Sequence, residues 1–389
     1  MKVIIIGGGI GGLTAANALH KVGIEAHVYE RAPQIREVGA GISVWTNAIR
    51  VLDALGFGEE IRSHSLANAA GSIRNWRGEI ISAVSIAQLE KQFGTAIAVV
   101  HRADLIEILL EELLSEQIHL GCELTNFSQN IDGATAHFAN HEIAHGDVLI
   151  GADGLQSAVR SQLLNDGRPR YSGYTAWRAV VNFEPPNLEP SETWGPGRRF
   201  GIVPMACGRI YWFATQNARE GERDDPGQTK TRLRELFSGW HHPIESILEA
   251  TEETAILRND IYDRDPIPHW GRNRVTLLGD AAHPATPNLG QGGCLAIEDA
   301  AVLTACLATI ANPDDALREY ENRRFPRTKG IVLSSRRIGE IAQMENAFLS
   351  FLRNLAIRAT PRSISNRQLN AVASFEALTE NEKLLFSRK

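Results

Sequence analysis

Three glycine-marked segments of this 389-residue chain have the residue types needed to bind a ligand that contains phosphate. The first is residues 7–12, Gly-Gly-Gly-Ile-Gly-Gly, which directly follows the apolar run at residues 3–6. The second is residues 151–160, Gly-Ala-Asp-Gly-Leu-Gln-Ser-Ala-Val-Arg, and the third extends from Leu278 to Gly293. Glycines permit a close approach of the backbone, and aspartates can accept hydrogen bonds from hydroxyl groups. The three segments are therefore expected to meet around one ligand.

The first segment has the sequence context of a dinucleotide-binding turn. Residues 2–6 are predicted to form a buried strand, residues 13–22 a helix and residues 24–29 a second strand. A pyrophosphate would lie at the N-terminus of the helix, where unpaired N–H groups and the helix dipole favour anions. Glu30 ends the second strand, about 20 residues after the glycines, where an acid can bind a ribose hydroxyl.

The glycines of the first segment have separate predicted roles. Gly7 permits the tight turn, Gly9 lets the backbone approach the pyrophosphate, and Gly12 lets helix and strand pack closely. A glycine-rich turn that binds nothing is the alternative. It does not account for the order of strand, glycines, helix, strand and acid.

The second and third segments each follow a predicted strand, at residues 147–150 and 274–278. The carboxylate of Asp280, at a strand end, could accept a hydrogen bond from a ribitol or ribose hydroxyl. Residues 290–293 then open a helix that continues to Leu307. The N-terminus of that helix would favour the negative charge of a reduced flavin.

These segments resemble those of the single-component, FAD-dependent aromatic hydroxylases, the flavoprotein monooxygenases that include salicylate hydroxylase and para-hydroxybenzoate hydroxylase. The likeness covers nearly the whole chain and includes Arg102 in His-Arg-Ala-Asp-Leu. Residues 173–178 and 287–300 are most similar to a subgroup with salicylate-type hydroxylases, the FAD-dependent urate hydroxylase and zeaxanthin epoxidase. The resemblance implies FAD contacts at Gly7, Gly9, Ile10, Gly11, Gly12, Glu30, Arg31, Ser43, Arg102, Leu124, Asp153, Asp280, Gly290, Gln291, Gly292 and Gly293.

The resemblance also implies the fold class and the domains. We expect an α/β fold like that of para-hydroxybenzoate hydroxylase: a Rossmann-like FAD-binding domain, an interleaved β-sheet substrate domain and a C-terminal helix. The expected FAD-binding domain comprises residues 1–70, 101–167 and 269–345, the substrate domain residues 71–100 and 168–268, and the C-terminal helical tail residues 346–389. The sequence pattern predicts strands throughout residues 71–100, completion of the cofactor sheet by residues 118–160, and substrate-domain strands at residues 175–183, 199–205 and 209–216.

Composition excludes several other classes of protein. The net charge of −6 and pI near 6.1 leave no polybasic footprint, so nucleic acid is not an expected partner. The four cysteines form no CxxC pair, which predicts neither a metal site nor disulfides and suits the cytoplasm. The first residues lead directly into a strand rather than a signal peptide, and the apolar stretch near residues 300–310 is too short to span a bilayer. Residues 348–352 are expected to pack as a C-terminal helix rather than to touch a membrane.

Candidate substrate residues lie on the predicted second sheet. Strand parity places Arg199, Gly201 and Val203 on one face, and Tyr211, Phe213 and Thr215 on one face of the next strand. By their spacing from Pro204, Arg199 and Tyr211 match residues that the urate hydroxylases use on their substrate. Arg178 is a third candidate, because a cation there could hold a carboxylate or a phenolate.

Each candidate has a structural alternative. Arg199 could be a surface charge on an edge strand, Tyr211 could be ordinary sheet packing, and Arg178 could form an internal salt bridge. The urate hydroxylases carry an acid at the position of Asn288, whereas zeaxanthin-epoxidase-like chains carry Asn there, so the resemblance leaves the substrate open. His283 is expected to have a structural role or to lie near the flavin.

The resemblance implies a monooxygenase with non-covalent FAD, NADH or NADPH as co-substrate, and O2. It would hydroxylate a small aromatic or heteroaromatic, acidic or phenolic molecule through a C4a-hydroperoxyflavin, with Arg199, Tyr211 and Arg178 orienting the substrate. The alternatives are a flavin epoxidase or hydroxylase of an isoprenoid or polyketide, and a flavin-binding protein without turnover. A monomer or homodimer is expected.

Overall fold

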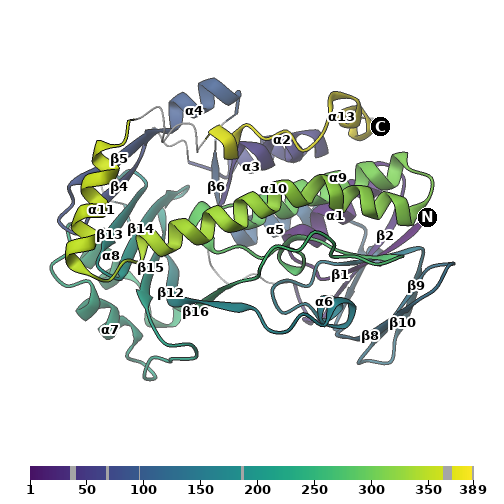
Figure 1. The fold of residues 1–389 in the computed structure, drawn as a ribbon, viewed down its shortest axis with the longest axis horizontal. Helices are drawn as coiled ribbons and strands as arrows, with labels where there is room; N and C mark the ends of the chain where they lie inside the picture. Colours follow the sequence, from purple (N-terminus) through teal and green to yellow (C-terminus); the bar gives the residue numbers. More distant parts are fainter. Residues whose placement is uncertain (36–40, 67–69, 96, 185–187, 362–369, 388–389) are drawn as a thin grey trace.

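The protein is described by a computed structural model that covers residues 1–35, 41–66, 70–95, 97–184, 188–361 and 370–387. Figure 1 shows two sheet regions side by side, with the long helix α10 (Pro313–Ala342) running from one to the other. Helix α11 (Ala347–Ala359) follows α10 at the outer edge of the second region. Parts that are distant in the sequence build each region, so the chain passes between the regions repeatedly.

The first region is built on a five-stranded parallel sheet with the order β17-β11-β1-β2-β7. Its central strands are almost fully buried because helices cover them, which explains their continuous apolar sequences. The strands are β1 (Lys2–Ile6), β2 (Glu25–Glu30), β7 (Ile118–Leu120), β11 (Val148–Gly151) and β17 (Val275–Leu277). The helices of this region are α1 (Ile10–Lys21), α2 (Thr46–Leu55), α3 (Gly58–Ser63), α5 (Arg102–Glu111), α6 (Ala158–Leu164), α9 (Gly292–Thr309) and α13 (Glu380–Phe386).

Parallel pairing brings the three glycine segments to the same edge of this sheet. Strands β1, β11 and β17 are neighbours, and each ends at the start of one glycine segment. Helix α9 has the length and apolar composition of a membrane span, but 78% of that window is buried inside the protein. It is a core helix that packs on α1 and α2.

The second region is a seven-stranded sheet with the order β16-β12-β15-β14-β13-β4-β5. Its strands are β4 (Ala70–Asn75), β5 (Ile80–Ser85), β12 (Arg170–Asn182), β13 (Ser191–Gly195), β14 (Arg198–Met205), β15 (Arg209–Asn217) and β16 (Leu257–Asp263). One face buries Trp177, Phe200 and Trp212 against helices α7 (Thr229–Leu236) and α8 (Ile244–Ala250). The other face is therefore left to meet the first region.

Several sequence predictions of elements were wrong. Strands β4 and β5 join the second sheet as expected, but residues 86–93 form helix α4 (Ile86–Phe93). Strand β6 (Ala98–His101) pairs instead with β3 (Gly41–Val44). Residues 118–160 complete the five-stranded sheet only in part, because a separate antiparallel sheet forms from β8 (Leu124–Gln129), β9 (Ala134–Phe138) and β10 (Ile143–Gly146). Helix α1 begins three residues before the predicted start, since Gly9 is its N-cap.

A cluster of buried charges joins α9 to α10. The fully buried Asp299 carboxylate accepts hydrogen bonds from Arg324 Nε and His283 Nε2, both at 2.6 Å. It also accepts one from the Gly279 N–H at 2.9 Å, while Arg324 pairs with Glu298 at 2.6 Å. Burial alone would raise the pKa of Asp299, but the charges of His283 and Arg324 and the hydrogen bonds lower it to about 2.

Replacing Asp299 with Asn should destabilise the protein in a pH-dependent way. A carboxyl whose pKa is depressed by folding contributes stability above its unfolded pKa near 3.8, and this contribution is lost as the pH falls toward 2. We expect the difference in unfolding free energy between wild type and Asp299→Asn to narrow by about 1 kcal/mol between pH 6 and pH 3. Urea denaturation at the two pH values measures it. A constant difference would mean that the Asp299 pKa is not depressed.

Candidate functional site

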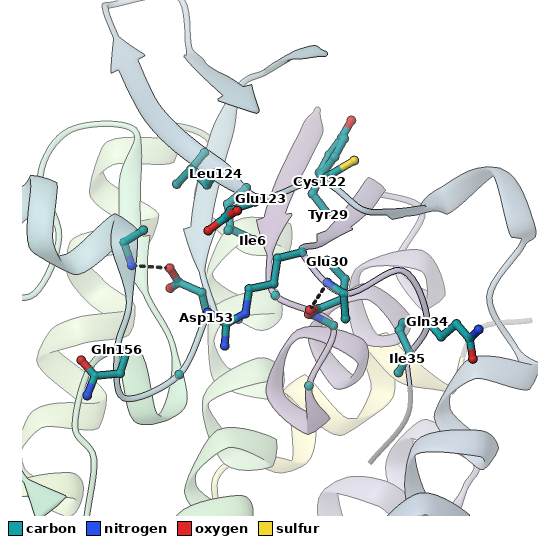
Figure 2. A pocket seen from close by; sticks show the side chains of 18 of the residues that line it. Ile6, Tyr29, Glu30, Gln34, Ile35, Cys122, Glu123, Leu124, Asp153 and Gln156 are labelled. Carbon is teal, nitrogen blue, oxygen red and sulfur yellow. Dashed lines mark hydrogen bonds between the residues drawn. The ribbon is translucent and has the colours of Figure 1, made fainter. Parts of the chain in front are cut away.

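A cavity of about 340 Å³ opens where β1, β2 and β11 end. Figure 2 shows Glu30, Asp153 and Leu124 around it, from three different parts of the chain. The structure thus brings seven of the predicted cofactor residues to one cavity: Gly7, Gly9, Glu30, Arg31, Arg102, Leu124 and Asp153. Other lining residues were not predicted: Gln34 and Ile35 belong to no glycine segment, and Gln156 lies in the second segment but has no residue type that marks it as a ligand contact.

The first glycine segment is shaped by close contacts on two sides and by open space on a third. Gly7 has φ +110°, and a Cβ there would lie 2.5 Å from the carbonyl oxygen of Ala152, in the second segment. A Cβ on Gly12 would overlap the carbonyl oxygen of Gly7. A Cβ on Gly9, by contrast, would meet no protein atom within 4 Å. The space beside Gly9 belongs to the cavity, at the N-terminus of α1, where Ile10, Gly11 and Gly12 form the first turn.

The Glu30 carboxylate is held at the cavity by the backbone. One oxygen accepts a hydrogen bond from the Gly8 N–H at 2.7 Å, and the other from the Ala32 N–H at 2.9 Å. Carboxylates have about four acceptor sites, so two remain for ligand hydroxyls.

Asp153 organises the second segment. Its carboxylate accepts hydrogen bonds from Ser157 Oγ at 2.5 Å and from the Ala158 N–H at 2.7 Å, at the start of α6. Burial raises the pKa of Asp153, and these hydrogen bonds oppose the shift. Asp153 therefore has a structural role besides lining the cavity.

Arg160 connects the second segment to the third. Its buried guanidinium pairs with Asp166 and donates to the carbonyl oxygens of Ala281 and Ala282, at 2.9 and 2.7 Å. The turn that carries Asp280 is thereby held against the second segment.

The remaining predicted cofactor residues gather at the N-terminus of α9. A Cβ on Gly292 would lie 3.7 Å from Asp280 Oδ1, and a Cβ on Gly293 would lie 2.7 Å from the side chain of Ile42, the neighbour of Ser43 in β3. Gly290 and Gln291 directly precede the helix. The Asp280 side chain reaches the surface, but other residues surround it closely. The resulting desolvation raises the pKa of its carboxyl, and the charges of His283 and Arg102 oppose this rise.

Two buried donors flank this helix terminus without a hydrogen-bond partner in the described structure, Gln291 Nε2 and Trp45 Nε1. The Trp45 nitrogen lies 3.2 Å from where a Cβ on Gly290 would be. Trp45 was not predicted, because it belongs to none of the motifs. Buried polar atoms are rarely left unpaired, so these donors fit a ligand that carries acceptor atoms.

Three observations therefore fit FAD. Open space lies beside the N-terminus of α1 at Gly9, a carboxylate stands at the end of β2, and unpaired donors surround the N-terminus of α9. Arg102 lines the cavity, and its charge opposes the rise in the pKa of both Asp280 and Tyr211. It therefore lies between the cavity and the residues at the N-terminus of α9. The individual cofactor contacts stay predictions.

The open face of the second sheet carries the predicted substrate residues. Register pairs Arg178 with Phe213, and Phe213 with Gly201, so all three share one face. Tyr211 lies on the same face, and its ring packs on the backbone of β3, 2.6 Å from where a Cβ on Gly41 would be. Burial raises the pKa of Tyr211, and the charges of Arg178 and Arg102 oppose this.

Arg199 shares this face but is occupied by protein partners. It is only 3% exposed, on an interior strand, so the alternative of an edge-strand surface charge is wrong. It pairs with Glu192 at 3.0 Å and donates to Gln343 Oε1 at 2.8 Å. Its guanidinium also lies 5.4 Å from the ring of Tyr174.

Arg178 has no such partners. No hydrogen bond or ion pair joins it to another residue that the structure describes, and its Nε is buried. The internal salt bridge considered for Arg178 is therefore absent from the described residues, whereas Arg199 has one. Asn288, the site of the departure from the urate hydroxylases, accepts a hydrogen bond from Tyr174 Oη at 3.3 Å and donates to Thr286 and Ser335.

Comparisons with known proteins agree with this geometry. The Aurachin C monooxygenase/isomerase of Stigmatella aurantiaca is 44% identical over 360 residues, which covers 92% of this chain and 94% of that protein. The FAD-dependent urate hydroxylase of Klebsiella pneumoniae is 36% identical over 343 residues, covering 87% and 89%. The crystal structure of Klebsiella pneumoniae HpxO complexed with FAD and uric acid has a TM-score of 0.89 at 33% identity, covering 96% and 97%.

The sequence profile of a family described as FAD binding domain matches residues 1–335 of this chain. These residues hold all three glycine segments, both clusters of predicted cofactor residues and the open face of the second sheet. The chain belongs to this FAD-binding family.

Proposed function

We propose that the protein is an FAD-dependent monooxygenase that uses NADH or NADPH and O2 to hydroxylate a small, anionic, aromatic or heteroaromatic molecule. One observation carries the choice of substrate. Arg178 is a cation without a described partner, on the sheet face that meets the cofactor region. Urate, after which one relative is named, is also the compound bound as uric acid in the HpxO structure, and it supports a small heteroaromatic molecule.

Two groups of predicted cofactor residues, one at the cavity and one at the N-terminus of α9, would hold non-covalent FAD between them. We propose that the N-terminus of α1 binds the pyrophosphate, and that Glu30 and Asp280 accept hydrogen bonds from ribose and ribitol hydroxyls. The N-terminus of α9, with Trp45 and Gln291, would hold the flavin ring. Bound FAD supplies the redox chemistry, in which a nicotinamide donates a hydride and O2 donates one oxygen atom to the substrate.

The residues of the second sheet would bind and orient the substrate. Arg178 would hold its carboxylate or phenolate, and Tyr211 would orient its ring. Phe213 and the adjoining valines, Val180 and Val203, would exclude water from the reacting carbon. Because Arg199 is already paired with Glu192, we assign it to positioning Tyr174 and the sheet rather than to direct contact with the substrate.

The overall reaction balances without a metal or a side-chain nucleophile. NAD(P)H, a proton, O2 and the aromatic C–H compound would give NAD(P)+, the hydroxylated product and water. Asn288 serves structural hydrogen bonds here, so we do not propose urate itself as the substrate. We further propose a cytoplasmic monomer or homodimer, in keeping with the four free cysteines. The domain boundaries given above also stay a proposal.

Substrate should control nicotinamide oxidation. We expect aromatic acids that fit to raise the rate of NADH or NADPH oxidation about tenfold or more, with matching O2 consumption, because the bound substrate completes the site. An oxygen electrode and absorbance at the nicotinamide band measure both. Stimulation only by apolar isoprenoids or polyketides would favour the epoxidase alternative. No stimulation by either class would contradict a monooxygenase.

Arg178 and Arg199 should respond differently to truncation. Arg178→Met should raise the KM for the anionic substrate by about 30-fold or more, because truncating one partner of a buried charge pair typically costs about 2–5 kcal/mol. FAD content should hardly change, and the melting temperature without substrate should not fall, because no protein partner is lost. Arg199→Met is the matched control. It should lower the melting temperature, because it leaves Glu192 and Gln343 without their partner.

Steady-state kinetics and thermal melts of the two variants separate these roles. If Arg199→Lys and Arg199→Met raise the KM while Arg178→Met does not, Arg199 holds the anion. If neither arginine affects the KM, an uncharged substrate is indicated.

A further inference from the structure

Helix α11 packs on the protein through its polar side and turns its apolar side outward. Ser350 and Arg353 are its buried residues. Phe348, Leu349, Phe351, Leu352 and Leu355 are each between 41% and 66% exposed. The expectation that residues 348–352 pack into the protein was therefore wrong. The sequence pattern of an amphipathic helix was present, but it does not say which side meets the protein.

Specific polar contacts hold α11 in this orientation. Ser350 Oγ donates to the Met344 carbonyl oxygen at 2.9 Å. Arg353 donates to the carbonyl oxygens of Ile341 and Ala342, at 3.2 and 2.9 Å, where α10 ends. Its guanidinium also lies 5.1 Å from the ring of Trp194. Rolling the helix to bury its apolar side would break all of these contacts.

The exposed side forms one continuous stripe. Phe348, Phe351, Leu352 and Leu355 have the i, i+3, i+4, i+7 spacing that lines one face of a helix. From their exposed fractions, the five side chains leave roughly 500 Å² of apolar surface, near the upper end for the largest patch on a monomer. The largest apolar patch on a monomer is often functional, so the stripe is a candidate contact surface.

The β4–β5 hairpin lies beside α11 and carries exposed residues typical of lipid interfaces. Trp76 and Ile80 are 40% and 53% exposed, and the Arg77 guanidinium lies 4.8 Å from the Trp76 ring. Arg358, near the end of α11, pairs with Glu79 of the hairpin at 2.9 Å. Tryptophan and arginine beside apolar side chains suit the boundary between headgroups and acyl chains.

Charge favours an anionic surface over other partners. Among the described residues, two exposed arginines border the patch, Arg77 on the hairpin and Arg358 near the end of α11, beside one exposed carboxylate, Glu79, although the whole chain has a net charge of −6. A second copy of the chain is the alternative occupant of the patch. A symmetric pair of stripes would bury only roughly 1,000 Å², below the roughly 1,200–2,000 Å² of stable interfaces.

We propose that α11 and the β4–β5 hairpin dock the protein on the surface of an anionic lipid bilayer. The helix would lie in the interface plane, with its apolar stripe among the lipids, and no segment would cross the membrane. This inference goes beyond the proposed function and does not depend on it.

Vesicle sedimentation tests the proposal with the purified, FAD-loaded full chain. Vesicles of phosphatidylcholine mixed with phosphatidylglycerol should bind the protein more tightly than phosphatidylcholine alone, and added salt should weaken that binding. The double variant Phe351→Ser/Leu355→Ser should bind at least about tenfold more weakly, since it removes the centre of the apolar stripe. FAD content and melting temperature should stay at the wild-type level, because both side chains are exposed.

Ile131→Ser/Ile143→Ser is the matched control. These two isoleucines are 77% and 57% exposed, but they lie on the three-stranded sheet formed by β8–β10, so their removal should leave vesicle binding unchanged. Failure of the wild-type protein to bind either kind of vesicle would overturn the proposal. Equal losses of vesicle binding in the two double variants would also overturn it. A dimer that only the α11 variant converts to a monomer, without vesicle binding, would assign the stripe to a second copy. Turnover is not measured, so failure here leaves the proposed function untouched.

Discussion

The buried ion cluster of Glu298, Asp299 and Arg324 is the constraint on which the cofactor cleft depends. Asp299 holds the turn before Asp280 through the Gly279 N–H and His283. Glu298 accepts a hydrogen bond from Asn47 at 2.6 Å, and Asn47 also donates to Gln291 at the start of α9. One cluster thus sets the strand end and the helix terminus that we assign to the flavin ring. Breaking a buried ion pair leaves an uncompensated charge, so the geometry is strongly enforced.

The two arginines of the second sheet differ in whether their charge is paired within the described protein. Arg199 builds the structure, since it joins β14 to Glu192 and to the end of α10 at Gln343. Arg178 contributes no described contact of this kind, although it sits on the same face. A half-buried cation without a protein partner costs stability unless something else binds it. That cost is the physical reason to assign the substrate anion to Arg178.

The sequence was sufficient for features that depend on neighbours along the chain. The turn after β1, the helix from residues 290–293 to Leu307 and the strand faces that carry Arg199 and Tyr211 follow from local pattern. Features that depend on distant partners were not predictable. The partner of Arg199 on α10 is 144 residues away, and nothing near Arg178 in the sequence indicates that it lacks one. The orientation of α11 likewise depends on carbonyl groups at the end of another helix.

The central claim is that all three glycine segments serve one dinucleotide, with Glu30 and α1 at one end and α9 at the other. Titration of the apoprotein with FAD and with FMN, followed by flavin fluorescence, tests it most directly. FMN lacks the adenosine half, so it would leave the Glu30 end of the cleft without a ligand. We predict binding of about one FAD per chain and far weaker binding of FMN. Equal affinity for FMN, or no binding of either flavin, would contradict the account.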